Sequence, residues 1–125
     1  MEYDLNKKIA EYTYAVVKDK PHFHISLVID VSPYCDCHAE NDVAVIPDIG
    51  MFASFDPVAL DVARADACNK QPMFTDSFLG AKADGCSCEQ DHFKTMHPNT
   101  NWKVCVEHAE KLGVGTTDYE LVVIK

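Results

Sequence analysis

No lysine or arginine occurs between Lys20 and Arg64 of this 125-residue chain, although seven carboxylates fall within the same stretch. The whole chain carries a formal net charge of −9. A surface of this sign repels phosphate backbones, so we do not expect nucleic acid as a partner. An acidic field instead attracts cations, and it raises the pKa of thiols inside it unless a metal ion offsets the charge.

Long hydrophobic runs are also missing from the sequence. No apolar run approaches the length of a membrane span, and the first five residues do not have the pattern of a signal peptide. We therefore expect a cytoplasmic protein that does not bind membranes. In that compartment the six cysteines of the chain indicate metal or redox chemistry rather than a disulfide framework.

Two motifs of common enzyme classes are absent. Residues 48–51 lack the further glycines and the basic residue of a phosphate-binding loop. Ser54 has no Gly-x-Ser-x-Gly elbow around it, so hydrolase chemistry gains no support. These absences leave open whether the protein is an enzyme at all.

Apolar spacing and turn residues predict one α/β domain over residues 1–125, with a mixed sheet flanked by helices. We expect helices at residues 4–18, 57–70 and 101–112, and strands at residues 24–31, 43–46, 49–55 and 119–124. In strand 24–31 the apolar side chains of Ile25, Leu27 and Ile29 alternate, while Val28 on the other side indicates partial burial of both faces. Residues 71–100 lack clean periodicity, and we interpret them as a long irregular segment held in place by a metal ion or ligand.

Two closely spaced cysteine pairs are the strongest chemical signal. Cys35, Cys37 and His38 follow an expected strand directly, and Cys86 with Cys88 repeats the one-residue spacing. Thiolates and imidazoles are the ligands that zinc, Cu(I) and the iron of iron–sulfur clusters prefer. We expect the first group to supply two or three metal ligands and the second pair to complete a tetrahedral set.

Other sulfur and imidazole groups have plainer explanations. Cys68 and Cys105 lie on expected helix faces, where cysteine usually acts as a small buried hydrophobe. His22 and His24 would point to the same side of a strand, a spacing that suits a metal but also an ordinary strand start. The histidines of the irregular segment, His92 and His97, remain alternative ligands.

Three stretches of the middle of the chain carry a family resemblance. Residues 29–37, 45–50 and 53–61 resemble the iron–sulfur centre proteins of domain-of-unknown-function family 362, and residues 108–115 with 119–121 look like that family's C-terminal end. The resemblance implies a cytoplasmic bacterial or archaeal protein associated with iron–sulfur chemistry, with no established reaction. Family members are usually longer, and many carry a ferredoxin-like insert with four-cysteine runs, which this chain lacks. The chain therefore looks like the C-terminal portion of the family architecture.

The leading hypothesis is a metal-binding domain, with an iron–sulfur cluster or zinc, that serves redox catalysis or electron transfer on an unknown substrate. The first alternative is a non-catalytic interaction domain whose loops are stapled by structural zinc. The second is one half of an enzyme whose active site is shared. The expected partners are the missing N-terminal or ferredoxin-like half or a redox partner, and self-association into a homo-oligomer is a further alternative.

Overall fold

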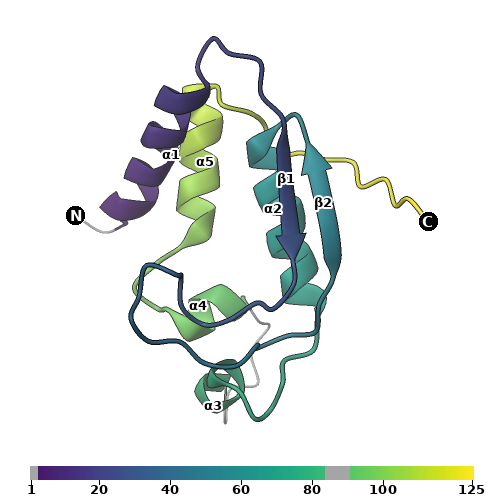
Figure 1. Cartoon of the computed structure of the whole chain (residues 1–125). Coiled ribbons are helices and arrows are strands. Elements are labelled where there is room, and N and C mark those ends of the chain that lie inside the picture. Colours follow the sequence, from purple (N-terminus) through teal and green to yellow (C-terminus); the bar gives the residue numbers. More distant parts are fainter. Residues whose placement is uncertain (1–2, 84–90) are drawn as a thin grey trace.

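The computed structural model describes residues 3–83 and 91–125, and within these ranges it contains five helices and one two-stranded sheet (Figure 1). The elements in chain order are α1 (Asp4–Val17), β1 (His24–Val28), β2 (Gly50–Ser54), α2 (Pro57–Lys70), α3 (Phe78–Ala83), α4 (His92–Met96) and α5 (Trp102–Leu112). The α/β class is confirmed. The three long helices and the strands near residues 24 and 50 also lie where the apolar spacing predicts them.

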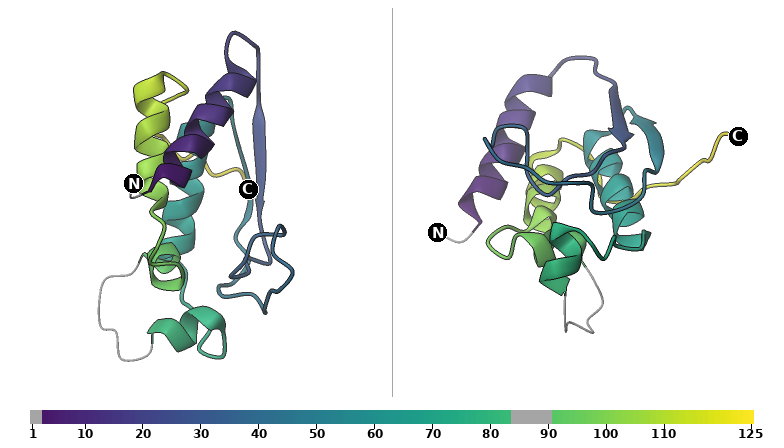
Figure 2. Two further views of the ribbon diagram at one scale, coloured as in Figure 1. Left: turned by 90° about the vertical axis from the view of Figure 1, so that its left-hand side faces the viewer. Right: turned by 60° about the horizontal axis from the view of Figure 1, so that its bottom comes forward.

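The two strands pair antiparallel, with His24 opposite Ser54 and Val28 opposite Gly50. The long helices all lie on one side of this sheet (Figure 2). β1 is shorter than predicted because Asp30 adopts a left-handed backbone conformation, at φ 47°. Its amide then donates to the Asp48 carboxylate at 2.7 Å, which turns the chain out of the strand.

Three expected local structures are wrong within the described residues. Residues 43–46 form no strand, although Val45 and Ile46 are buried. The Val45 amide donates to the Val31 carbonyl and the Val45 carbonyl accepts from the Phe74 amide, so both backbone groups of Val45 are satisfied without a strand pairing. Residues 119–124 are exposed and unpaired with the sheet, and the irregular segment contains the short helices α3 and α4.

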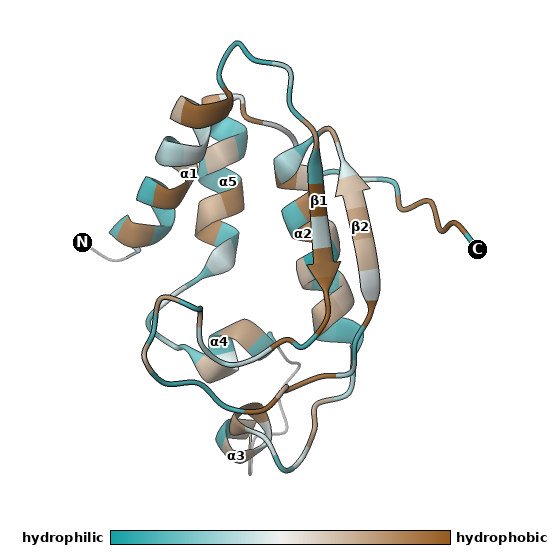
Figure 3. Cartoon of the chain, in the orientation of Figure 1, coloured by the Kyte–Doolittle hydropathy of each residue, from teal (hydrophilic) through white to brown (hydrophobic). Residues whose placement is uncertain are grey.

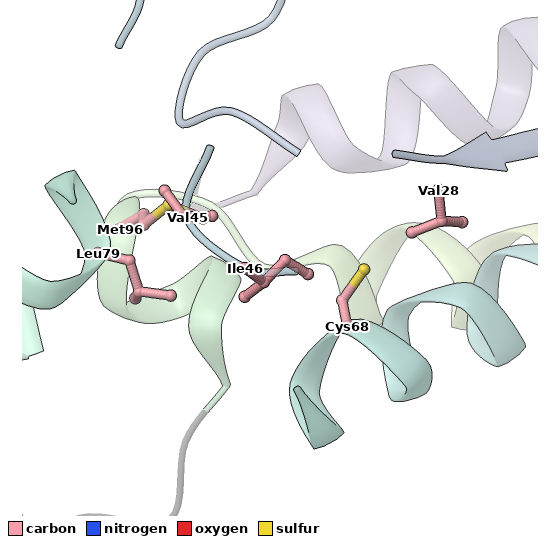
Figure 4. Close-up of a cluster of buried hydrophobic side chains, with 6 residues drawn as sticks. All are labelled: Val28, Val45, Ile46, Cys68, Leu79 and Met96. Carbon is pink, nitrogen blue, oxygen red and sulfur yellow. The ribbon is translucent and has the colours of Figure 1, made fainter. Parts of the chain in front are cut away.

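Two small cores hold the helices and loops together. The first joins β1, the 45–46 loop, α2, α3 and α4 through six buried side chains (Figure 4): Val28, Val45, Ile46, Cys68, Leu79 and Met96. The second lies between α1, α2 and α5 and consists of Ala10, Val58, Val106 and Ala109. These small side chains allow close approach of the three helices.

Several apolar side chains of the sheet and of α1 point away from these cores. On β1, Ile25 and Leu27 are 61% and 63% exposed, whereas Ser26 and His24 face the helices. The apolar stripe of α1 is exposed in the same way, and its members are Leu5, Ile9, Tyr12 and Val16. Figure 3 shows apolar residues along β1 and along the C-terminal tail, which extends away from the helices. The predicted period of both elements is therefore right. The exposed side of β1 carries Ile25 and Leu27, and Val28 on the opposite side is buried.

Asp56 begins α2 as the sequence predicts, with Pro57 at the first helical position. Its Oδ1 atom accepts from the amides of Val58 and Ala59 at 2.9 and 3.0 Å. Its Oδ2 atom accepts from the Thr116 amide at 2.9 Å, which ties the C-terminal segment to α2. A methyl group at Gly115 would overlap this carboxylate, so only glycine fits beside it.

We expect Asp56→Ala to lower the free energy of unfolding by about 1–2 kcal/mol through the lost helix cap. The lost bond to Thr116 adds up to about 1 kcal/mol. Asp56→Asn keeps the Oδ1 acceptor and is the matched control, with a smaller loss. Urea denaturation followed by circular dichroism measures both variants. An alanine variant as stable as the native protein would show that this cap is not used in solution.

None of the helices in the described part of the chain is long and apolar enough to span a bilayer.

Candidate functional site

The thiol loop, which we define as residues 32–42 between β1 and β2, is held by the side chain of Asn41. Its Oδ1 atom accepts from the Tyr34 amide at 3.1 Å. Its Nδ2 group donates to the Ser32 hydroxyl at 3.0 Å and to the Tyr34 carbonyl at 3.1 Å. One amide thus bridges both ends of the loop, which leaves Cys35 and Cys37 at its tip with a defined backbone.

The base of the thiol loop contacts two other parts of the chain. The Tyr34 ring lies 5.5 Å from the ring centroids of both Phe78, on α3, and His97, after α4. His97 Nε2 donates to the Pro33 carbonyl at 2.6 Å. His97 was an alternative metal ligand, and the structure instead uses it as an anchor for this loop.

The thiols of Cys35 and Cys37 are both exposed and lie close enough to affect each other's ionisation. The backbone and thiol of Cys37 hydrogen-bond Cys35 and lower the pKa of Cys35, and the Asp36 amide adds to the shift. In turn, the hydrogen bond to the Cys35 thiol raises the pKa of Cys37. The acidic stretch was expected to raise both values. For Cys35 that expectation is wrong, because backbone N–H donors outweigh the Asp36 charge.

His38 closes the turn, because its amide donates to the Cys35 carbonyl at 3.0 Å. Its ring lies 5.2 Å from the Tyr34 ring, and its Nδ1 atom lies 3.4 Å from a Glu40 carboxylate oxygen. Within residues 3–83 and 91–125, no group of three or more His, Cys, Asp and Glu side chains is arranged to hold a metal ion. The described donors therefore fit part of a metal site, a thiol pair, rather than a whole one.

The second cysteine pair, Cys86 and Cys88, lies outside the described residues. The helices before and after that stretch are described, and they border the thiol loop: α3 through Phe78 and the end of α4 through His97.

The other candidate cysteines and histidines pack in the cores or make hydrogen bonds within the fold. Cys68 is buried and Cys105 half-buried, and burial raises the pKa of both thiols. They act as core side chains, as the sequence predicts. His92 is buried, and its Nε2 donates to the Gln71 carbonyl at 2.9 Å. His22 and His24 do lie together, with 2.7 Å between Nδ1 of the first and Nε2 of the second.

Sequence reasoning missed Asn41 and the polar contact of Arg64 with the sheet. Asn41 could have been found, because an asparagine next to a thiol-bearing turn commonly bonds nearby backbone groups. Arg64 donates to the Ser26 hydroxyl at 2.8 Å from a distant element, and no local pattern signals that contact.

The lower pKa of Cys35 compared with Cys37 predicts which thiol reacts first. In metal-free protein near neutral pH, we expect iodoacetamide to label Cys35 several-fold faster than Cys37, because the thiolate is the nucleophile and the pKa of Cys35 is the lower one. Peptide mass spectrometry after timed labelling measures both rates. Cys37→Ser removes one of the groups that lower the pKa of Cys35 and should slow its labelling. Faster labelling of Cys37 in the native protein would contradict the assigned order.

Comparison with known proteins identifies a family for the first half of the chain. The model of "Domain of unknown function (DUF362)" matches residues 1–66, which include α1, both strands, the thiol loop and the start of α2. No curated protein and no solved structure gives a significant match. The matched part contains Cys35, Cys37 and His38 on the loop whose geometry is described above. The chain belongs to the DUF362 family.

Proposed function

We propose that the protein is a metal-binding domain in which Cys35 and Cys37 supply two thiolate ligands of a redox or structural metal centre. The observation that carries the proposal is the exposed pair of adjacent thiols, one of which has a lowered pKa. A thiol that ionises readily is a ready metal ligand, because the thiolate is the coordinating form. The centre would supply either electron-transfer chemistry, as an iron–sulfur cluster, or rigidity, as zinc.

The remaining ligands must come from groups beyond the described thiol pair. His38 lies in the same turn and could release its Glu40 contact to coordinate. Cys86 and Cys88, which the structure does not describe, are the further candidates from the sequence. Two thiolates from one Cys-x-Cys turn leave two positions of a tetrahedral site for these groups.

The choice between the two metal centres is open to direct measurement. Anaerobic purification, elemental analysis and visible absorption together form the test. The proposal expects about one metal centre per chain that survives gel filtration. Brown protein with a paramagnetic reduced state would assign an iron–sulfur cluster, and colourless protein with zinc would assign the structural role. Protein isolated without metal, which takes up neither zinc nor a reconstituted cluster, would refute both.

The exposed apolar side chains of the sheet and of α1 favour a second role, compatible with metal binding, in which the chain docks onto another protein or domain. Exposed apolar surface of this extent is typical of surfaces that bind another protein. On the sheet it includes Ile25, Leu27 and Met51, with Phe55 directly after β2, and the stripe of α1 adds a second face. We propose that the partner that buries this surface is the remaining half of the family architecture or a redox protein. This role holds even if no metal is found.

A further inference from the structure

A cavity of about 300 Å³ lies between the helix-facing side of β1 and the helices α2 and α5. Its walls are mainly apolar and come from Val28, Val31, Phe93, Trp102 and Val106, with the thiols Cys68 and Cys105. Figure 4 shows Cys68 on α2 with its sulfur turned toward the side on which Val28 lies. A space of this size is at the small end of the range for ligand pockets. It is separate from the thiol loop.

One end of the cavity is polar, because Ser26, Asp61 and Arg64 meet there. Arg64 Nη1 donates to the Ser26 hydroxyl at 2.8 Å, and Nη2 pairs with Asp61 Oδ1 at 2.5 Å. Asp61, Arg64 and Cys68 follow at helical spacing along α2, so that a single helix face lines the cavity. Partial burial raises the pKa of Asp61, against the opposing effect of Arg64.

At this end of the cavity the inward side of β1 is polar, whereas Val28 further along the same side is buried in the first core. His24 and Ser26 face the helices while Ile25 and Leu27 face outward, although burial of apolar side chains would favour the reverse. The inward Ser26 orients the guanidinium at the rim of the cavity. A guanidinium has five N–H donors in a fixed fork, so it can hold these two contacts and still donate to a ligand oxygen.

We propose that this cavity binds a small, uncharged, mostly apolar molecule that carries one hydrogen-bonding oxygen, such as an alcohol, a phenol or a ketone. The apolar walls accept its hydrocarbon part. Asp61 and Arg64 have opposite charges in contact, so the rim offers no net charge to compensate an ionic ligand that would lose its hydration on entry. The oxygen accepts from Arg64, and a hydroxyl can also donate to Asp61. This inference does not depend on a metal centre.

Trp102 provides a direct probe, because it is the only tryptophan of the chain and lines the cavity. Its Nε1 donates to Asp91 at 2.9 Å, which fixes the ring. The full chain is titrated with p-cresol, toluene and benzoate, three ligands of one ring size. Binding is measured from the indole N–H signal in a ¹H–¹⁵N spectrum. We expect saturable binding of p-cresol, about tenfold weaker binding of toluene, which lacks the hydrogen bond to a charged group, and no binding of benzoate.

Two variants and a control make the test specific. Ala65→Leu adds a larger side chain at the cavity wall and should abolish p-cresol binding, whereas Ala81→Leu at an exposed position of α3 should not. Arg64→Met removes the donor to the ligand oxygen and should narrow the difference in affinity between p-cresol and toluene. This variant keeps the proposal testable if Ala65→Leu does not fold, and an unchanged difference would count against it. Unsaturable shifts, equal affinities of the three probes for the native chain, or binding unchanged in a folded Ala65→Leu variant would overturn the proposal.

Discussion

We predict that replacing Cys35 and Cys37 together by serine will leave the purified protein without bound metal. A serine hydroxyl has a much higher pKa than a thiol and is a poor ligand for zinc or for iron–sulfur iron, so both soft ligands of the turn are lost. Metal content by elemental analysis should fall from about one centre per chain to the background of the buffer. The side chains are exposed, so the apo fold should remain within about 0.5 kcal/mol of the apo native protein.

The matched control removes two thiols that the account assigns to packing. Cys68→Ala with Cys105→Ala should keep the metal and lose stability instead, because Cys68 is buried in the first core and Cys105 packs against the second. Comparison of the two double variants separates a general dependence on thiols from ligation by the thiol loop. Equal metal content in the native protein and in the Cys35→Ser, Cys37→Ser variant would eliminate these residues as ligands.

We predict that the isolated chain, with this apolar face uncovered, associates with itself at high concentration, and that lysines on the outer face of the sheet abolish the association. Leu27 and Met51 are cross-strand partners, 63% and 69% exposed, in the centre of that face. Two charges there cannot be buried against another apolar surface without a large desolvation cost. We expect Leu27→Lys with Met51→Lys to sediment as a 13.9 kDa monomer and to bind several-fold less hydrophobic dye than the native chain.

The control for this variant has the same change of charge on polar surface, Glu107→Gln with Glu120→Gln, and should associate like the native chain. The lysine pair should also leave the free energy of unfolding within about 1 kcal/mol of its native value, because the replaced side chains are already exposed. Strong destabilisation would mean that this face is buried within the chain itself. A native chain that stays monomeric and binds no dye would remove the basis for a docking role.

Local sequence patterns were sufficient for the long elements of the fold. Asp56 with Pro57 gives the start of α2 and Gly113 the end of α5, and both signals are carried by a few neighbouring residues. The direction of the faces was not predictable in the same way. Alternation in β1 gives the period, but whether Ile25 or Ser26 faces the helices depends on tertiary contacts, such as the burial of Val28 and the bond of Ser26 to Arg64, 38 residues away.

In the candidate site, too, the local features were predictable and the features that depend on tertiary contacts were not. The Cys-x-Cys spacing placed two thiols on one turn, and that placement is local. The lowered pKa of Cys35 depends on the orientation of backbone amides in the turn, which composition does not specify, so the acidic stretch suggested the opposite shift. The anchoring of the loop by His97 is a contact between segments 64 residues apart and left no pattern in the chain.

X-ray absorption spectroscopy at the edge of the bound metal tests the central claim most directly, since it counts the sulfur atoms that coordinate the ion. For anaerobically isolated protein we predict at least two sulfur ligands, at about 2.3 Å if the metal is zinc, and their loss when Cys35 and Cys37 are serine. A first shell of oxygen and nitrogen alone, or a sulfur count that the two serines leave unchanged, would contradict ligation by this thiol pair.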